Sequence, residues 1–131
     1  MQFEVERLKL NQVLDGVSDV VPSKTAIPVL SHLLFEIVQE EGQEKGVGRA
    51  TISATDLDVS ISSSVPVSML ESGRFTVPAR KFIEIVRELP EGMLSFDVKE
   101  NRVTLVQQDQ GRYVLMGLPP EDYPEIPSEI E

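Results

Sequence analysis

The chain has 131 residues, enough for one domain with a hydrophobic core, and its 40% hydrophobic content argues against disorder. The absence of cysteine excludes disulfides, thiolate metal sites and cysteine nucleophiles. Because there is neither a long apolar run nor a basic segment followed by a hydrophobic one, we expect a cytoplasmic protein without a membrane partner. The 22 acidic and 12 basic residues give a formal net charge of -10, which taken alone argues against a nucleic-acid binder.

The first part of the chain predicts one strand, one helix and three more strands. Phe3-Glu4-Val5 alternates as a strand does, and a helical apolar stripe follows it. The period then changes to two in three segments, around residues 33–37, 50–54 and 59–65. The polar run from Gln39 to Gly48 predicts a long hairpin loop between the first two of these strands. The helical stripe has apolar residues at i, i+3, i+4 and i+7: Leu10, Val13, Leu14 and Val17.

The same order of elements returns 72 residues later. Phe75-Thr76-Val77 aligns with the first strand, Pro78 stands where a helix begins, and Pro90 ends it. Three strands are again expected, around 94–98, 103–105 and 113–116. The second helix repeats the four apolar positions of the first, as Phe82, Ile85, Val86 and Leu89.

These patterns predict an α+β domain with two-fold internal pseudosymmetry, made of two strand-helix-three-strand units at about 1–66 and 73–118. The remaining tail, "LPPEDYPEIPSEIE", is rich in proline and acid and is typical of an extended exit from a domain. We therefore expect the domain to cover residues 1–121 and a linker to begin at 122–131.

Candidate catalytic groups are few. Asp56 and Asp58 are two carboxylates in one turn, a pair that can bind a cation or act as acid and base. No His, Cys or third acid stands at ligand spacing, so we expect Asp56 to cap the turn by accepting backbone N–H bonds. His32, the single histidine, is expected to be structural or solvated. We predict no catalytic residue, cofactor or metal. Two alternatives stay open: a carboxylate- or metal-dependent hydrolase using the two aspartates, and a duplicated protein-interaction module without a DNA role.

Six stretches carry a family resemblance over nearly the whole chain: "FEVER", "IPVLSHLLFEI", "TDLD", "TVPARKF", "LPEG" and "LPPEDYP". In this order and spacing the chain resembles the amino-terminal domain of the bacterial sliding clamp, the β subunit of DNA polymerase III. The resemblance implies a DNA-clamp domain with helices on one side of antiparallel sheets. It also implies a non-catalytic processivity factor, in which three such domains form a subunit and two subunits close into a ring around duplex DNA. A second clamp domain would follow the linker, and the polymerase and clamp loader are expected to bind the later domains.

The resemblance also implies which residues face DNA. In the ring the helices line the central hole. Phosphate contacts without sequence specificity are therefore expected on the helix faces opposite the apolar stripes, which point into that hole. Most of the acidic residues behind the net charge are then expected on the outside of the ring, which DNA does not touch. The expected DNA contacts are Lys24, in the loop after the first helix, Arg80 at the start of the second, and Lys9 and Arg87.

The last strand of the second unit is apolar on both faces. Tyr113 and Leu115 point one way, Val114 and Met116 the other, so something besides this domain's helices should cover one side. In the resembling family this strand meets the other subunit. The resemblance thus implies an interface formed by Tyr113 and Leu115 as apolar contacts, with Lys81 and Arg112 facing acids on the partner. The alternative is that local packing or the tail buries both faces of the strand. In the isolated domain we expect Tyr113 and Leu115 to be largely exposed.

Overall fold

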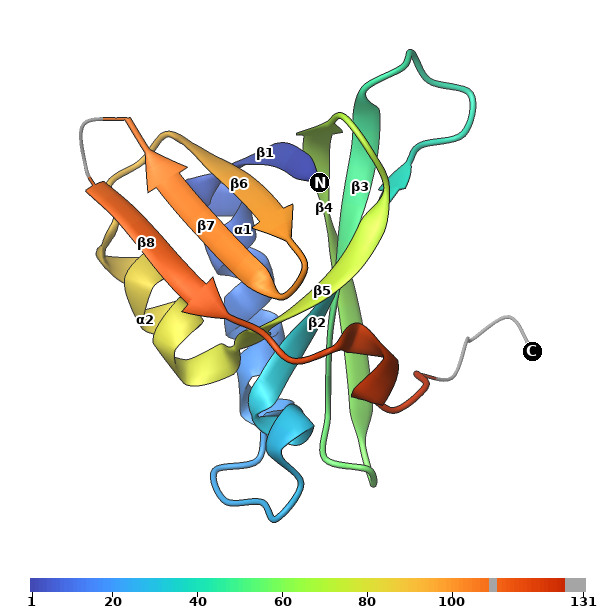
Figure 1. The fold of residues 1–131 in the computed structure, drawn as a ribbon, viewed down its shortest axis with the longest axis vertical. Coiled ribbons are helices and arrows are strands. Elements are labelled where there is room, and N and C mark those ends of the chain that lie inside the picture. Colours follow the sequence, from blue (N-terminus) through green and yellow to red (C-terminus); the bar gives the residue numbers. More distant parts are fainter. Residues whose placement is uncertain (109–110, 127–131) are drawn as a thin grey trace.

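A computed structural model describes residues 1–108 and 111–126 (Figure 1). Its elements confirm the predicted strand, helix and three strands, twice over. The first unit contains β1 (Gln2–Glu6), α1 (Arg7–Val17), β2 (His32–Gln39), β3 (Val47–Thr55) and β4 (Ser60–Met69). The second contains β5 (Gly73–Pro78), α2 (Ala79–Glu88), β6 (Met93–Lys99), β7 (Arg102–Gln107) and β8 (Gly111–Met116). Short 3-10 turns lie at η1 (Ser18–Val20), η2 (Pro28–Ser31) and η3 (Pro120–Asp122).

The two units are interlocked by an exchange of their first strands. The strands form one antiparallel sheet in the order β5-β2-β3-β4-β1-β6-β7-β8. Thus β1, from the first unit, pairs along its length with β6 of the second, while β5 of the second unit pairs with β2 of the first. Neither unit can therefore complete its sheet alone, a feature that the linear repeat in the sequence does not reveal.

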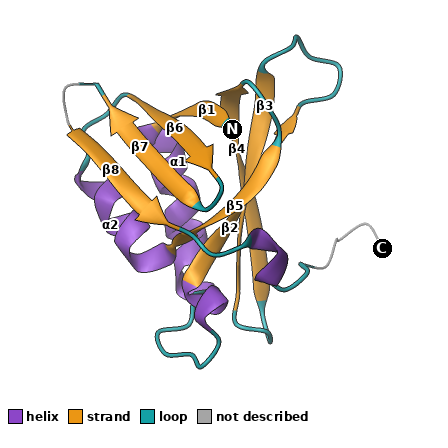
Figure 2. Cartoon of the chain, in the orientation of Figure 1, coloured by secondary structure: helices purple, strands orange, loops and turns teal. Residues whose placement is uncertain are grey.

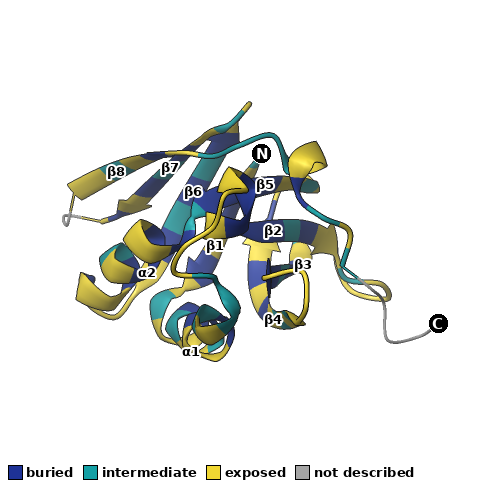
Figure 3. Cartoon of the chain, turned by 90° about the horizontal axis from the view of Figure 1, so that it is seen from below, coloured by how far each residue is buried: buried dark blue, intermediate teal, exposed yellow. Residues whose placement is uncertain are grey.

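Both helices cover the same face of the sheet, as the resemblance implied (Figures 2 and 3). Their apolar stripes are buried at Leu10, Leu14 and Val17 in α1 and at Phe82 and Val86 in α2, with Leu89 just beyond it. Two stripe positions differ from the expectation. Val13 and its repeat equivalent Ile85 are only partly buried, whereas Ile83, which the stripe omitted, is buried. The buried stripe of α2 is therefore Ala79, Phe82, Ile83 and Val86, which is rotated about the helix axis relative to the expected one.

Four phenylalanines hold the exchanged strands together. The β1–β6 register sets Phe3 opposite Phe96, with the rings stacked at a centroid distance of 4.6 Å. The β5–β2 register does the same for Phe75 and Phe35, at 4.8 Å. Phe3 and Phe75 are repeat equivalents and lie 5.9 Å apart, so the two stacked pairs meet at the pseudo-two-fold axis. Aromatic rings bury large apolar areas, and this cluster therefore stabilises the interlocked arrangement.

The tail does not leave the domain where the sequence suggested. The segment Gly117–Tyr123, named here the strap, crosses the sheet on the side away from the helices (Figure 3). Tyr123, expected in the linker, is only 6% exposed and packs with Val29 and Leu34 in a second small core. The domain therefore continues past residue 121, because a tyrosine in this acidic, proline-rich tail has an apolar site to fill.

Candidate functional site

The exposed faces of α1 and α2, with the loop after α1, form the candidate DNA-facing surface. Residues 7–24 and 79–88 hold six of the twelve basic residues of the chain but only four of the 22 acidic ones. The other 18 acidic residues therefore lie elsewhere in the sequence. The basic residues of this surface are Arg7, Lys9, Lys24, Arg80, Lys81 and Arg87, and the acidic ones are Asp15, Asp19, Glu84 and Glu88.

Three of the four predicted DNA contacts are exposed cations without an ion pair to a described residue. Lys9, Lys24 and Arg80 are exposed, and none of them pairs with a carboxylate within the part of the chain that the structure describes. Arg80 also lines a hollow of about 370 Å³ between η1 and α2, together with Ser18 and Arg87. Cations of this kind are free to meet a phosphate oxygen.

The fourth predicted contact, Arg87, is already engaged. Its Nη2 lies 3.0 Å from Oδ1 of Asp15, which occupies the equivalent position in α1, so the pair bridges the two helices. Arg7 adds a second tie, because its Nε donates to the carbonyl of Val86 at 2.9 Å and its Nη2 to that of Arg87 at 2.8 Å. These carbonyls lie at the end of α2, where that of Val86 also accepts the N–H of Leu89 at 3.3 Å, and Arg7 adds a donor to each of them. Arg87 thus fixes the angle between the helices and is a weaker phosphate ligand than Arg80.

The predicted subunit contacts lie on α2 and on the edge strand β8. Arg112 is exposed, and Lys81 is exposed with Nζ 3.6 Å from Oε2 of Glu84. The outer edge of β8 has no partner strand among the described residues, since its single described pairing is with β7.

The expectation that Tyr113 and Leu115 are largely exposed is wrong. Leu115 is 6% exposed and belongs to the main core, and Tyr113 is partly buried against it. The exposed apolar side chains of β8 are instead Val114, at 52%, and Met116, at 60%. The reason is the register, which sets Leu115 opposite the buried Val103 on the helix-facing side of β7. A strand that is apolar on both faces gives no signal of which face is inward.

The remaining titratable candidates have structural roles. Oδ1 of Asp56 accepts the N–H of Val59 at 2.8 Å and that of Asp58 at 2.9 Å, which confirms the turn-capping interpretation. These two bonds, the one from Val59 first, lower the pKa of Asp56. His32 is buried, with Nδ1 3.1 Å from Oγ1 of Thr76, and its burial lowers its pKa. Within residues 1–108 and 111–126 no three His, Cys, Asp or Glu side chains gather as metal ligands. In that same part, each helix is too short or too polar to span a bilayer.

Comparison with known proteins places this geometry in a family. The profile described as "DNA polymerase III beta subunit, N-terminal domain" matches residues 1–127. The chain is 35% identical to the beta sliding clamp of Haemophilus influenzae over 127 residues, covering 96% of this chain and 32% of that protein. It is 32% identical to the one of Chlamydia muridarum, covering 97% and 32%. The chain thus spans about a third of the length of these relatives.

Solved structures agree with the sequence relatives. The pol III beta subunit of Caulobacter crescentus has a TM-score of 0.83 at 32% identity, over 98% of this chain and 33% of that one. The Helicobacter pylori beta clamp, solved with a DNA ligase peptide, has a TM-score of 0.85 at 21% identity, over 98% and 34%, and supports the fold alone. The match over 1–127, the interlocked two-unit fold and the helix-borne cations together show that this chain belongs to the DNA polymerase III β subunit family and is an amino-terminal sliding-clamp domain.

Proposed function

We propose that this domain forms part of a ring that encloses duplex DNA and tethers the replicative polymerase, without catalysing a reaction itself. The observation that carries the proposal is the separation of charge. Half of the basic residues lie on the two helices and the loop after α1, while 18 of the 22 acids lie elsewhere. A sliding ring needs an inner surface that attracts phosphates and an outer surface that does not.

The DNA contacts proposed are Lys24 and Arg80 first, then Lys9, and Arg87 last. Lys24 and Arg80 are exposed and free of ion pairs with described residues, so each can approach a phosphate without breaking an existing interaction. Phosphate contacts carry no sequence information, which lets the ring move along DNA. Arg87 would have to share its guanidinium with Asp15.

The subunit contact proposed is the outer edge of β8. An unpaired edge strand exposes backbone N–H and C=O groups, and a strand of the partner subunit would extend the sheet there. Arg112 and Lys81 would face acids of that partner. Leu115 lies in the core behind this edge, and Tyr113 is partly buried against that core. Both would contribute to the joint by holding β8 in position. The polymerase and clamp loader would bind later domains joined through the tail.

The DNA proposal is tested in a chimera, in which this chain replaces the first domain of the Caulobacter crescentus clamp. We expect Lys24→Ala with Arg80→Ala to shorten the retention of the loaded chimera on nicked circular duplex while the ring still closes. The matched control is Lys45→Ala with Arg74→Ala, two exposed cations on the sheet side. Equal retention for both double variants would support the alternative of an interaction module without a DNA role.

The joint is tested with exposed residues alone, because Leu115→Asp would disrupt the core of the domain itself. Lys81→Glu with Arg112→Glu should turn the closed chimera into folded monomers in analytical ultracentrifugation, because two attractive charge pairs become repulsive. If this variant stays dimeric at submicromolar concentration, the ring closes at another surface.

A further inference from the structure

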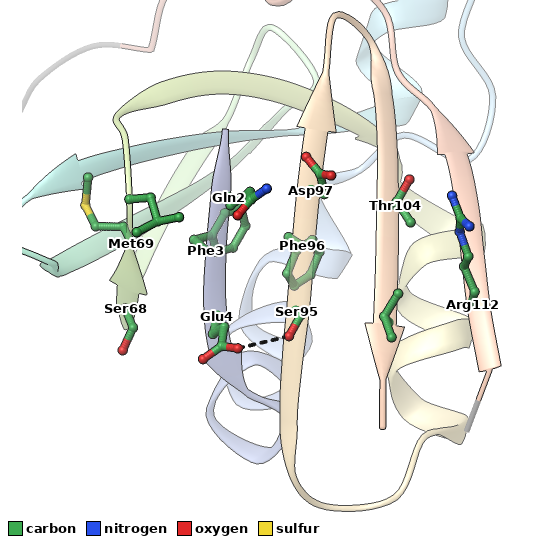
Figure 4. Close-up of a pocket in the computed structure, with 12 residues that line it drawn as sticks. Gln2, Phe3, Glu4, Ser68, Met69, Ser95, Phe96, Asp97, Thr104 and Arg112 are labelled. Carbon is green, nitrogen blue, oxygen red and sulfur yellow. Dashed lines mark hydrogen bonds between the residues drawn. The ribbon is translucent and has the colours of Figure 1, made fainter. Parts of the chain in front are cut away.

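Asp15 lies in the last turn of α1, where neither the helix nor the surface favours an acid. The C-terminal end of a helix carries a partial negative charge, so a carboxylate there lowers the stability of the helix. Asp15 also stands among the cations of the candidate DNA-facing surface, whereas Glu4 and Asp97, for example, line a groove on the other face of the sheet (Figure 4). Among the described residues the carboxylate of Asp15 has one partner, the guanidinium of Arg87.

This ion pair is exposed and is made by a single contact. Nη2 of Arg87 lies 3.0 Å from Oδ1 of Asp15, and the two side chains are 53% and 55% exposed. Water solvates both charges at such a site, so an exposed pair adds little to the stability of a fold. The pair can therefore open at little cost, and stability alone gives no reason for an acid at this position.

The main chain of Arg87 is held independently of its side chain. Nη2 of Arg7 donates to the carbonyl of Arg87, and the backbone N–H of Arg7 donates to the carbonyl of Gly92 at 2.9 Å. These bonds keep the end of α2 against the start of α1 when the guanidinium of Arg87 leaves Asp15. Arg87 also borders the hollow of about 370 Å³ that Arg80 lines, so there is open space beside it. The guanidinium can thus exchange partners while α2 keeps its place.

We propose that Asp15 competes with DNA phosphates for Arg87 and thereby limits how tightly the helix surface holds DNA. Carboxylate and phosphate oxygens accept the same guanidinium N–H groups, so one replaces the other. When a phosphate takes Arg87, the carboxylate of Asp15 is left unpaired beside the DNA, and their repulsion favours the return of Arg87. A contact that is exchanged in this way is easily made and broken, as movement along DNA requires. The inference rests on the proposed function, because it needs this surface to face DNA.

The test measures binding of the chain to a short duplex by fluorescence anisotropy over a series of salt concentrations. Asp15→Asn removes the charge of the competitor with little change of shape. We expect it to tighten binding about two- to fivefold at low salt, which is the contribution of one exposed ion pair. The slope of log K against log salt should steepen by up to about 0.9, because one more phosphate is engaged. Asp15→Glu keeps the carboxylate and should behave as the unmodified chain does.

Two controls separate competition from a general effect of charge. Asp19→Asn makes the same change of net charge on the same surface, at an exposed acid without an ion pair to a described residue, and should tighten binding by less than about twofold with no change of slope. In an Arg87→Ala background, Asp15→Asn should gain no more than Asp19→Asn does. Equal gains from the two single variants, or an undiminished gain without Arg87, would overturn the proposal.

A reference variant separates this inference from the proposed function. Lys24→Ala with Arg80→Ala, measured in the same assay, should weaken binding. If it does so while Asp15→Asn leaves both affinity and slope unchanged, the competition is refuted and the DNA-facing surface stands. If none of these variants changes binding, or the chain does not bind duplex even at low salt, the surface and the competition are refuted together.

Discussion

Gly117 is a position where the strap passes close to the backbone of β5. A Cβ at this residue would overlap the carbonyl oxygen of Thr76 and lie 3.1 Å from its Oγ1. The overlapping atom is backbone inside the sheet, so it cannot move aside as the end of a side chain would. Gly117→Ala must then displace the strap or distort β5.

The expected cost follows from these contacts. Forced overpacking costs roughly 1–3 kcal/mol, and weakening the two bonds between Thr76 and Leu118 adds about 1 kcal/mol, so we expect a loss of about 2–4 kcal/mol. With a urea m-value of about 2 kcal/mol/M the unfolding midpoint should fall by roughly 1–2 M. Burial now raises the pKa of Tyr123 to about 12. If the strap lifts, that pKa should return toward ~10 in an alkaline tyrosinate titration.

The matched control is Gly16→Ala. Gly16 is an exposed residue of α1, and a Cβ there meets no atom within 4 Å. This variant should gain about 0.5–1 kcal/mol, because alanine favours the helix and restricts the unfolded chain. Midpoint shifts of the same sign and size for the two variants would refute the steric reasoning at Gly117.

Three further predictions concern the core, the single histidine and the ion pair between the helices. Leu14→Ala should cost about 2–5 kcal/mol in urea denaturation, because Leu14 is fully buried, while the exposed Gln12→Ala costs less than about 0.5; a reversed ranking would mean that the helix faces are misassigned. Because burial lowers the pKa of His32, the unfolded chain takes up a proton first on acidification, so the free energy of unfolding should fall as the pH drops below ~6.5. His32→Asn, which keeps a donor toward Thr76, should flatten that dependence between about pH 7 and 5.5, and an unchanged slope would assign it to other groups. Asp15→Asn should release Arg87 and steepen the salt dependence of duplex binding, measured by fluorescence anisotropy, whereas an unaltered slope would mean that Arg87 does not reach phosphate.

The sequence predicted the positions of the strands and helices better than it predicted which strands pair in the sheet. Periodicity reports which residues share a face, and it placed the strands and helices of both units. It carries no information on which strand lies beside which, so the exchange of β1 and β5 was not predictable from the repeat. The same limit explains Leu115. Alternation with apolar residues on both faces cannot say which face is buried, and only the register with Val103 decides it.

The candidate surfaces were predictable to different degrees. Lys9, Lys24 and Arg80 are exposed because they lie opposite the apolar stripes or in a loop, a property that spacing does encode. The engagement of Arg87 with Asp15 depends on how two helices cross, which no local pattern contains. Tyr123 was wrongly assigned to the linker because composition describes a segment as a whole. It does not show that one aromatic side chain of the segment packs against Val29 and Leu34.

The exchange of first strands has a consequence for how the chain acquires its structure during synthesis. β1 is made first, yet its partner along most of its length is β6, with Gln2 opposite Asp97. A nascent chain that has emerged only as far as β4 leaves β1 and the edge of β2 without these partners. Such long sequence separations slow folding and delay it until almost the whole domain is available. During that interval two neighbouring nascent chains can exchange their β1 strands, so crowded translation should favour domain-swapped dimers.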